Sequence, residues 1–405
     1  MDISFKRYLR ISIFNLLLVA SIGVVLRYKI LYSLPFVDQK HLLHGHSHFA
    51  FAGWITQTLM VLMLVYLSRA NRRDEFVRYK WLLLANLVTA YGMLIAFPIQ
   101  GYGAVSITFS TLSVFTSYAF AIRYWKDLNG INKDDIAHLW LKAALLSAVF
   151  SSAGTFALAF MMANKMIHQD WYLAAVYFYL HFQYNGWFFF ACMGLLHTLL
   201  PSGILENTRL RTVFHLFALA SIPAYFLSTL WMALPTWMYI LVVFAAFAQV
   251  LAWGIFIRIL FTHRVLLTES ISKEGRWLMG LSAMALTIKL LLQLGSTIPA
   301  LSQLAFGFRS IVIAYLHLVL LGVITMFLLG YIFSLHIVQV RMLAKYGLVA
   351  FSTGIFLNEL VLMLQGIASF SYNSIPYANE LLLCMALLMF SGISLLLLSQ
   401  SQKQK

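Results

Sequence analysis

The chain has 405 residues, of which 62% are hydrophobic and only 10% are charged, and its formal net charge is +15. Soluble domains average about half apolar and a quarter charged residues, so a soluble enzyme, a DNA-binding domain and a disordered chain are excluded. The composition predicts an all-α, polytopic membrane protein. Cys192 and Cys384 each lie within an apolar run, so neither a disulfide framework nor a thiolate metal site is expected.

Apolar runs long enough to cross a bilayer occur twelve times, since a transmembrane helix needs about 20 apolar residues. They span residues 11–33, 44–68, 80–99, 102–123, 138–163, 171–200, 211–233, 236–261, 276–298, 309–335, 345–366 and 379–399. We therefore expect a single integral membrane domain over residues 1–405, with twelve transmembrane helices and no soluble domain. The first run is not expected to be a cleaved signal, because Arg27 and Lys29 stand near its far end. No internal repeat is evident.

The basic residues predict an orientation. An even number of crossings places both termini on one side, and that side then holds 22 of the 28 Lys and Arg residues. Lys289 falls within the membrane. The opposite side holds five: Arg27, Lys29, Lys40, Lys165 and Arg309. Because Lys and Arg concentrate in cytoplasmic loops, both termini are expected in the cytoplasm. The positive charge is thus a topology signal, and no nucleic-acid partner is expected.

Histidines inside apolar runs are the main functional signal, because ionisable residues in a bilayer are costly and usually functional. A single membrane histidine is as often only a hydrogen-bonding contact between helices. The second run opens with HLLHGHSHFAFAGW, in which His41, His44 and His48 lie three and four residues apart, near one helical face. His46 points elsewhere.

Three of these runs bring a histidine to a similar depth. The spacing is 8 residues from Lys40 to His48, 11 from Asp170 to His181, and 8 from Arg309 to His317. At about 1.5 Å per residue, all three histidines lie about 12–17 Å below the outer surface. The sequence therefore predicts one layer of histidines in the outer half of the membrane.

Two facing imidazoles in an apolar bundle are what a low-spin haem iron needs. Gly53 and Gly322 each follow a candidate ligand by five residues. Without side chains they would let a macrocycle lie against the helix, although small residues also serve ordinary helix packing. Four outer cations would either pair with haem propionates or extend to the interface: Arg27, Lys29, Lys40 and Arg309.

A second pair of membrane residues carries opposite charges. Lys289 is 13 residues beyond Arg276, and Glu359 is 14 beyond Lys345. Both would lie about 20 Å from the inner face. Since an unpaired charge there is expensive, the sequence predicts a mutual ion pair, which either fixes helix packing or handles protons beside the haem.

Twelve predicted helices with histidines on the second, sixth and tenth resemble subunit I of the heme-copper oxidase superfamily, which includes the nitric oxide reductases. The spacing from His48 to Trp54 is similar to the family's low-spin haem ligand on the second helix. YLHLVLLG resembles the tenth-helix signature and places His317 on the other low-spin ligand. WYLAAVYFYLHFQYNGWFFFACMGLLHTLLP resembles the sixth helix, especially of the C-family oxidases, and places His181 on a copper ligand. TVFHLFALA resembles the seventh helix, with His215 near its start.

The departures from this family pattern concern the catalytic metals. Tyr315 stands where the family's high-spin haem ligand is expected, and the adjacent copper-binding histidines of the seventh helix are absent from FLSTLWMALP. Copper needs several nitrogen ligands, and His215 is too distant in depth from His181 to share one. Copper is therefore not expected. Tyr315 would either bind a second haem or, more simply, mark a lost site, with His181 as its other remnant.

The sequence predicts a subunit I-like bundle that binds one low-spin, b-type haem through His48 and His317 and transfers electrons or senses a redox state or a gas. His44 and His46 are the alternative ligands to His48. The resemblance implies a bacterial inner membrane, with an external electron donor or other respiratory-type subunits as partners. One alternative is an active oxidase or nitric oxide reductase with unusual ligands. Another is a cofactor-free, proton-coupled transporter using His181, Lys289 and Glu359.

Overall fold

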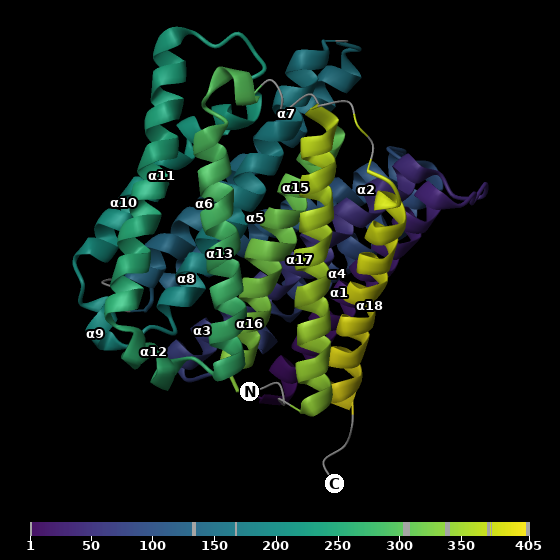
Figure 1. Ribbon diagram of the computed structural model, residues 1–405. Helices are drawn as coiled ribbons and strands as arrows, with labels where there is room; N and C mark the ends of the chain where they lie inside the picture. Colours follow the sequence, from purple (N-terminus) through teal and green to yellow (C-terminus); the bar gives the residue numbers. More distant parts are fainter. Residues whose placement is uncertain are drawn as a thin grey trace. The chain divides into compact units, whose positions relative to one another are not determined.

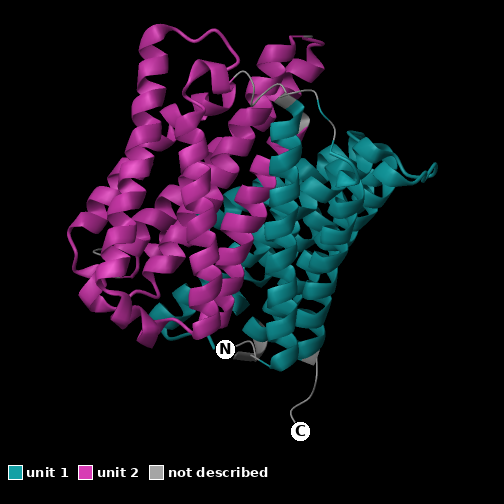
Figure 2. Ribbon diagram, viewed as in Figure 1, with its two compact units in different colours: residues 1–123, 335–405 teal, residues 124–334 magenta. Residues whose placement is uncertain are grey.

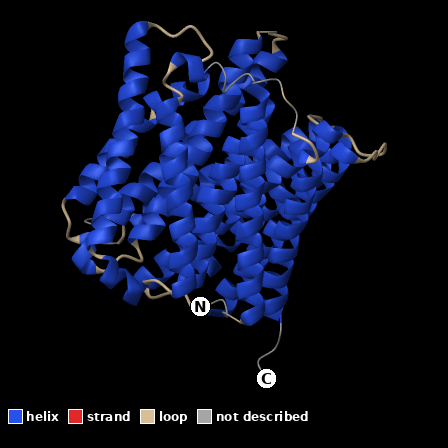
Figure 3. Ribbon diagram, in the orientation of Figure 1, coloured by secondary structure: helices blue, strands red, loops and turns tan. Residues whose placement is uncertain are grey.

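The computed structural model describes residues 2–131, 135–166, 168–302, 308–336, 341–370, 373 and 375–401. Most of these residues are helical, short loops join the helices, and the described residues contain no strand (Figure 3). The predicted all-α class is therefore confirmed. Three of the basic residues used to predict the orientation, Lys133, Lys403 and Lys405, lie outside the described residues.

The chain packs as two compact units, which Figure 2 distinguishes by colour and Figure 1 labels by helix. Unit 1 comprises residues 1–123 and 335–405, and unit 2 comprises residues 124–334. The helices of unit 1 are α1 (Asp2–Leu31), α2 (Gln39–Phe49), the π-helix η1 (Ala50–Thr56), α3 (Gln57–Asn71), α4 (Glu75–Gln100), most of α5 (Ala104–Leu128), α17 (Met342–Phe370) and α18 (Ala378–Ser401).

Unit 2 contains two further π-helices and one 3₁₀ segment. Its elements are α6 (Ile136–Ala163), α7 (Gln169–His181), the π-helix η2 (Phe182–Phe188), α8 (Phe189–His197), α9 (Ser202–Leu205), α10 (Arg209–Ser221), the 3₁₀ helix η3 (Pro223–Thr229), α11 (Thr236–Thr262), α12 (Arg264–Ser270), α13 (Lys273–Gly295), α15 (Arg309–His317), the π-helix η4 (Leu318–Thr325) and α16 (Met326–Ser334).

Ten helices of the described chain are long and apolar enough to cross a membrane, or eleven if the bent pair α10–η3 is one span. The fold therefore defines an α-helical integral membrane protein. The predicted run at 171–200 is helical, as α7, η2 and α8, but is not among the ten. It carries His181, Gln183 and Asn185, whose polar side chains lower its hydropathy. The count of twelve spans stays a prediction.

Capping residues set where several helices begin. A side-chain oxygen at the N-cap accepts a hydrogen bond from a backbone N–H of the first turn, which would otherwise lack a partner. Four helices have such a cap, and each distance joins the side-chain oxygen to the backbone nitrogen. Asp38 caps α2 and accepts from His41 at 2.7 Å, and Asp74 caps α4 and accepts from Phe76 at 3.0 Å. Asp135 caps α6 and accepts from Ala137 at 2.8 Å, and Ser272 caps α13 and accepts from Gly275 at 3.0 Å. The His41 N–H also lowers the pKa of Asp38, so the carboxylate that caps α2 stays ionised.

In unit 1, α18 packs along both α17 and α1. The Arg10 guanidinium of α1 donates to the Gln400 carbonyl of α18 at 3.0 Å, so the start of α1 lies beside the end of α18. Glycines allow the close approach of α17 and α18: a Cβ on Gly392 would lie 2.6 Å from the Phe351 nitrogen and 2.7 Å from the Gly347 carbonyl.

We predict that Gly392→Leu destabilises the protein, because the new side chain has no space between α17 and α18. Inserting bulk into a packed interface costs about 1–3 kcal/mol. Thermal unfolding in detergent measures the effect. Gly254→Leu is the control, since a Cβ at Gly254 meets nothing within 4 Å. Equal melting temperatures for the two variants would contradict the packing of α17 on α18.

Candidate functional site

Each of the three candidate histidines stands at the start of a π-helical segment. His48 lies two residues before η1, while His181 and His317 directly precede η2 and η4. In a π-helix the backbone hydrogen bond spans five residues instead of four, and such segments occur often at functional sites. The sequence analysis identified the histidines but gave no indication that the helix changes form after them.

A glycine follows each histidine at the same distance. The segments read HFAFAGW from His48, HFQYNGW from His181 and HLVLLGV from His317, with glycine five residues after the histidine in all three. Each π-helix also packs against the long helix that precedes it in the chain: η1 against α1, η2 against α6, and η4 against α13. The three segments share this short pattern, which adds Gly186 to the two predicted glycines.

Side chains from neighbouring helices satisfy backbone carbonyls within η1. Asn15 of α1 donates to the Gly53 carbonyl at 2.6 Å, and its own side-chain oxygen accepts from Tyr91 at 2.6 Å. Asn86 of α4 donates to the Ala52 carbonyl at 3.1 Å. A buried carbonyl without a partner is expensive, so these amides stabilise the π-helical form.

A side chain from a neighbouring helix also satisfies a backbone carbonyl within η4. Ser282 of α13 donates to the Val323 carbonyl at 2.7 Å. At Gly322 a Cβ would lie 3.1 Å from the Cβ of Ala285, so this glycine permits α13 to approach closely. At Gly53 a Cβ would lie 2.5 Å from the Phe49 ring. Gly322 therefore contacts a neighbouring helix, whereas the space beside Gly53 is taken by Phe49 of the same helix.

The histidines of α2 divide between two faces, as their spacing predicts. A Cβ on Gly101, whose φ is +61°, would lie 2.5 Å from His41 Nε2, and the His44 ring meets Tyr102 edge-on with centroids 4.7 Å apart. His46 instead faces α1, where a Cβ on Gly23 would lie 3.6 Å from its ring. His41, His44 and His48 therefore share the face of α2 that packs against the end of α4.

His48 is half-buried against aromatic rings. Its imidazole stacks on Phe97, with centroids 4.3 Å apart and planes 13° from parallel. Its Nε2 lies 3.4 Å from the Tyr102 hydroxyl, which is at the long end of the hydrogen-bond range. The buried His44 Nε2 has no hydrogen-bond partner among the described residues. An apolar, stacked imidazole with a weakly engaged nitrogen is suited to binding a metal.

His181 is 1% exposed, and both of its ring nitrogens are engaged in unit 2. Its Nε2 donates to the Ser221 carbonyl at 2.8 Å, and its Nδ1 accepts from the Asn185 amide at 3.2 Å. The Ser221 carbonyl is available because α10 ends there, before Pro223 and a 48° bend. His181 would have to give up one of these bonds to ligate a metal.

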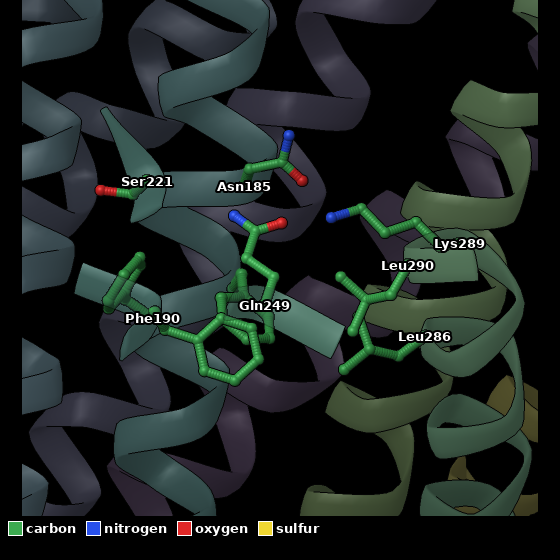
Figure 4. A pocket seen from close by; sticks show the side chains of 9 residues that line it. Asn185, Phe190, Ser221, Gln249, Leu286, Lys289 and Leu290 are labelled. Atoms are coloured by element: carbon green, nitrogen blue, oxygen red, sulfur yellow. The ribbon is translucent and has the colours of Figure 1, made fainter. Parts of the chain in front are cut away.

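A small polar cavity lies beside Asn185. It measures about 10 Å³, which gives room for about one water molecule. The Lys289 side chain of α13 enters it, and in Figure 4 the amine points toward the amides of Gln249 and Asn185. Lys289 is 5% exposed, and the described residues offer this amine no hydrogen bond or ion pair. The Gln249 Oε1 also lacks a partner, so one water molecule here would bridge both groups.

Tyr315 lies close to the same group of residues in unit 2. Its ring is 6.3 Å from that of Tyr184, edge to face. Tyr184 is three residues beyond His181, so the two predicted remnants of a metal centre, His181 and Tyr315, lie in the same region of unit 2.

Glu359 lies in unit 1, whereas Lys289 lies in unit 2. Within unit 1, the Asn358 amide donates to the Glu359 carboxylate at 3.1 Å, and the charges of Glu359 and Arg27 attract one another. The ion pair of Lys289 with Glu359 stays a prediction, and Arg27 is a second candidate partner for the carboxylate. The sequence analysis had considered Arg27 only as a propionate partner or an interfacial residue.

The remaining predicted residues have varied positions. Lys29 donates to the Leu34 carbonyl at 2.8 Å. Arg309 begins α15, but its side chain lies outside the described residues. His215 is exposed on α10, in contrast to the buried His181. No group of three or more His, Cys, Asp or Glu is placed to hold a metal ion within the described part of the chain, but a bis-His haem would take only two protein ligands.

Comparison of the sequence with models of known families and with curated proteins finds no match. The resemblance to the heme-copper oxidase superfamily therefore stays a prediction. What the structure adds independently is the repeated His-x₄-Gly π-helix, together with a hydrogen-bonded His181 and a buried Lys289.

We predict that His181→Leu lowers the stability of the protein, because it leaves the Ser221 carbonyl and the Asn185 amide without partners. Side-chain hydrogen bonds between membrane helices contribute about 0.6–2 kcal/mol each. The melting temperature in detergent should fall clearly for His181→Leu and little for His215→Leu, a matched change at an exposed position. Comparable losses for both variants would show that the bonds of His181 do not stabilise the fold.

We predict that Glu359 and Arg27 are energetically coupled. Removing one of two attracting charges leaves the other uncompensated, whereas replacing both removes that penalty. Arg27→Met and Glu359→Leu should therefore each destabilise the protein more than the double variant does in a thermal-unfolding cycle. The parallel cycle of Lys289→Met with Glu359→Leu tests the sequence-based pair. If the effects are additive in the Arg27 cycle and coupled in the Lys289 cycle, the partner of the Glu359 carboxylate is Lys289 and not Arg27.

Proposed function

We propose that the protein is a haem-binding integral membrane protein in which His48 and His317 are the axial ligands of one low-spin, b-type haem. Its function would be electron transfer, or the sensing of a redox state or a small gas. The observation that carries the proposal is the repeated pattern: a histidine, a π-helical segment that begins one or two residues later, and a glycine five residues after the histidine. A π-helical turn widens a helix locally and is common where a helix presents a ligand.

The surroundings of His48 fit an axial ligand. Phe97 stacks on the imidazole and limits its rotation. The hydrogen bond between His48 Nε2 and the Tyr102 hydroxyl is long, at 3.4 Å, so replacing it with a bond to iron would cost little. His44, one turn away on the same face, has a nitrogen without a partner among the described residues and is the first alternative ligand. Ring orientation fixed by packing is a general feature of metal-binding histidines.

A bound haem would supply a one-electron redox centre. His48 and His317 would hold the iron through neutral imidazole, and the apolar side chains around them would keep water away from it. With both ligands supplied by the protein, the group would favour electron transfer over chemistry on a bound molecule. The engagement of both His181 nitrogens supports the view that no copper ion accompanies the haem, because a ligand lone pair on this residue is already used.

The proposal also includes the membrane topology, the location and the partners of the protein. We place twelve spans in the membrane, with both termini cytoplasmic, in a bacterial inner membrane, and in a bundle like that of oxidase subunit I. An external donor or a partner subunit would deliver electrons. The 22 basic residues on one side of the predicted topology support this orientation.

The visible absorption spectrum of the purified protein tests the haem assignment. We expect a low-spin haem spectrum in the wild type and its loss, or conversion to a five-coordinate spectrum, in both His48→Ala and His317→Ala. His215→Ala, at an exposed position, should leave the spectrum unchanged. A normal low-spin spectrum in both ligand variants would overturn the assignment, and its loss in His44→Ala instead of His48→Ala would move the ligand by one turn.

The cavity at Lys289 favours a second candidate function, a cofactor-free proton-coupled transporter. A buried amine beside one water-sized space, next to Asn185 and His181, is the kind of group that proton pathways use. Purified protein without haem, together with proton uptake into vesicles that Lys289→Met abolishes, would favour this function over the first. A haem spectrum with unchanged proton permeability would exclude it.

A further inference from the structure

A second, larger cavity lies in unit 2, apart from the polar cavity at Lys289. It measures about 220 Å³ and lies between α8, α11, α12, α13 and the η4–α16 helix. Apolar side chains such as Met193, Phe256 and Ile324 form most of its wall. An apolar cavity of about 150 Å³ holds a benzene molecule, so this one has room for a segment of hydrocarbon chain.

Arg276 is the one charged residue among those that line this cavity. Its Nη1 donates to the Thr268 carbonyl at 3.0 Å and to the Ile271 carbonyl at 2.5 Å, which holds the guanidinium against the end of α12. No carboxylate of the described chain forms an ion pair with it. The donors on Nη2 and Nε are therefore available to an anion, and a guanidinium binds phosphate oxygens well.

The segment around Arg276 is basic overall. Residues 258–276 contain four cations, Arg258, Arg264, Lys273 and Arg276, and two carboxylates, Glu269 and Glu274. Basic pockets at the ends of membrane helices attract anionic lipid headgroups. The short helix α12 exposes apolar Val265 along with these charges, as expected of a segment at the membrane interface.

The cavity is open at Gly280 of α13. Gly280 is exposed, and a Cβ there would meet nothing within 4 Å. Along the same helix Trp277 and Met284 are exposed apolar side chains, as expected where a helix faces lipid. A hydrocarbon chain can thus enter from the bilayer beside Gly280, with its polar end near Arg276, which lies four residues earlier and therefore about 6 Å along the helix axis.

We propose that this cavity binds one anionic phospholipid, with an acyl chain among the apolar side chains and the phosphate on Arg276. The apolar wall, the guanidinium without an ionic partner and the opening at Gly280 are separate features that together match a ligand with an anionic head and a hydrocarbon tail. A purely apolar molecule would leave Arg276 unused, and a free phosphate would leave the apolar cavity unfilled. This site is independent of the proposed haem.

Native mass spectrometry of the detergent-solubilised protein tests the proposal, with phosphatidylglycerol and phosphatidylcholine added separately. The wild type should retain one phosphatidylglycerol more strongly than phosphatidylcholine. Gly280→Leu should lose this lipid, because the new side chain occupies the opening. Arg276→Gln should bind it about fivefold more weakly, the factor expected for one basic residue near a lipid surface.

A matched control separates this site from general lipid contact. Gly254→Leu places the same side chain at an exposed glycine of α11 that does not line the cavity. It should retain phosphatidylglycerol as the wild type does, and thermal unfolding confirms that each variant is folded. Unchanged retention in Gly280→Leu, equal loss in Gly254→Leu, or equal retention of the two lipids by the wild type would each overturn the proposal.

Discussion

The structure depends on one constraint: inside a membrane every backbone carbonyl must find a donor within the protein. Regular α-helix meets this constraint locally, but η1, η2 and η4 depart from it within two residues after a histidine. In the first and last of these, side chains from a neighbouring helix, Asn15 and Ser282, donate to carbonyls of the π-helix. The helix irregularity and the helix packing therefore stabilise each other.

The same constraint gives the three histidines different roles. His181 lies beside the break before Pro223, and its imidazole supplies the donor that the Ser221 carbonyl needs. His48 instead packs between aromatic rings with a long contact at Nε2, so its nitrogen is available to another partner. One repeated sequence unit thus carries a structural histidine in one copy and, in the proposed function, metal ligands in the other two.

Much of the fold followed from composition and period. All twelve apolar runs are helical, and the spacing of His41, His44 and His48 placed them on one face, because both features depend only on local helix geometry. The partners of His181 and Glu359 were not predictable. Ser221 is 40 residues from His181, and Arg27 is far from Glu359 in the chain, so these contacts arise from tertiary packing. The spacing of Gly186 from His181 can be read from the sequence, but its correspondence to Gly53 and Gly322 was recognised only from the three π-helices.

The ratio of haem to protein in the purified wild-type chain decides whether the proposed haem site exists. We expect one haem per chain, with the electron paramagnetic resonance signal of a low-spin ferric iron held by two imidazoles. Protein that is folded, as judged by cooperative thermal unfolding in detergent, and that contains no haem would contradict it. In that case the π-helical histidines would serve packing alone, as the bonds of His181 already do.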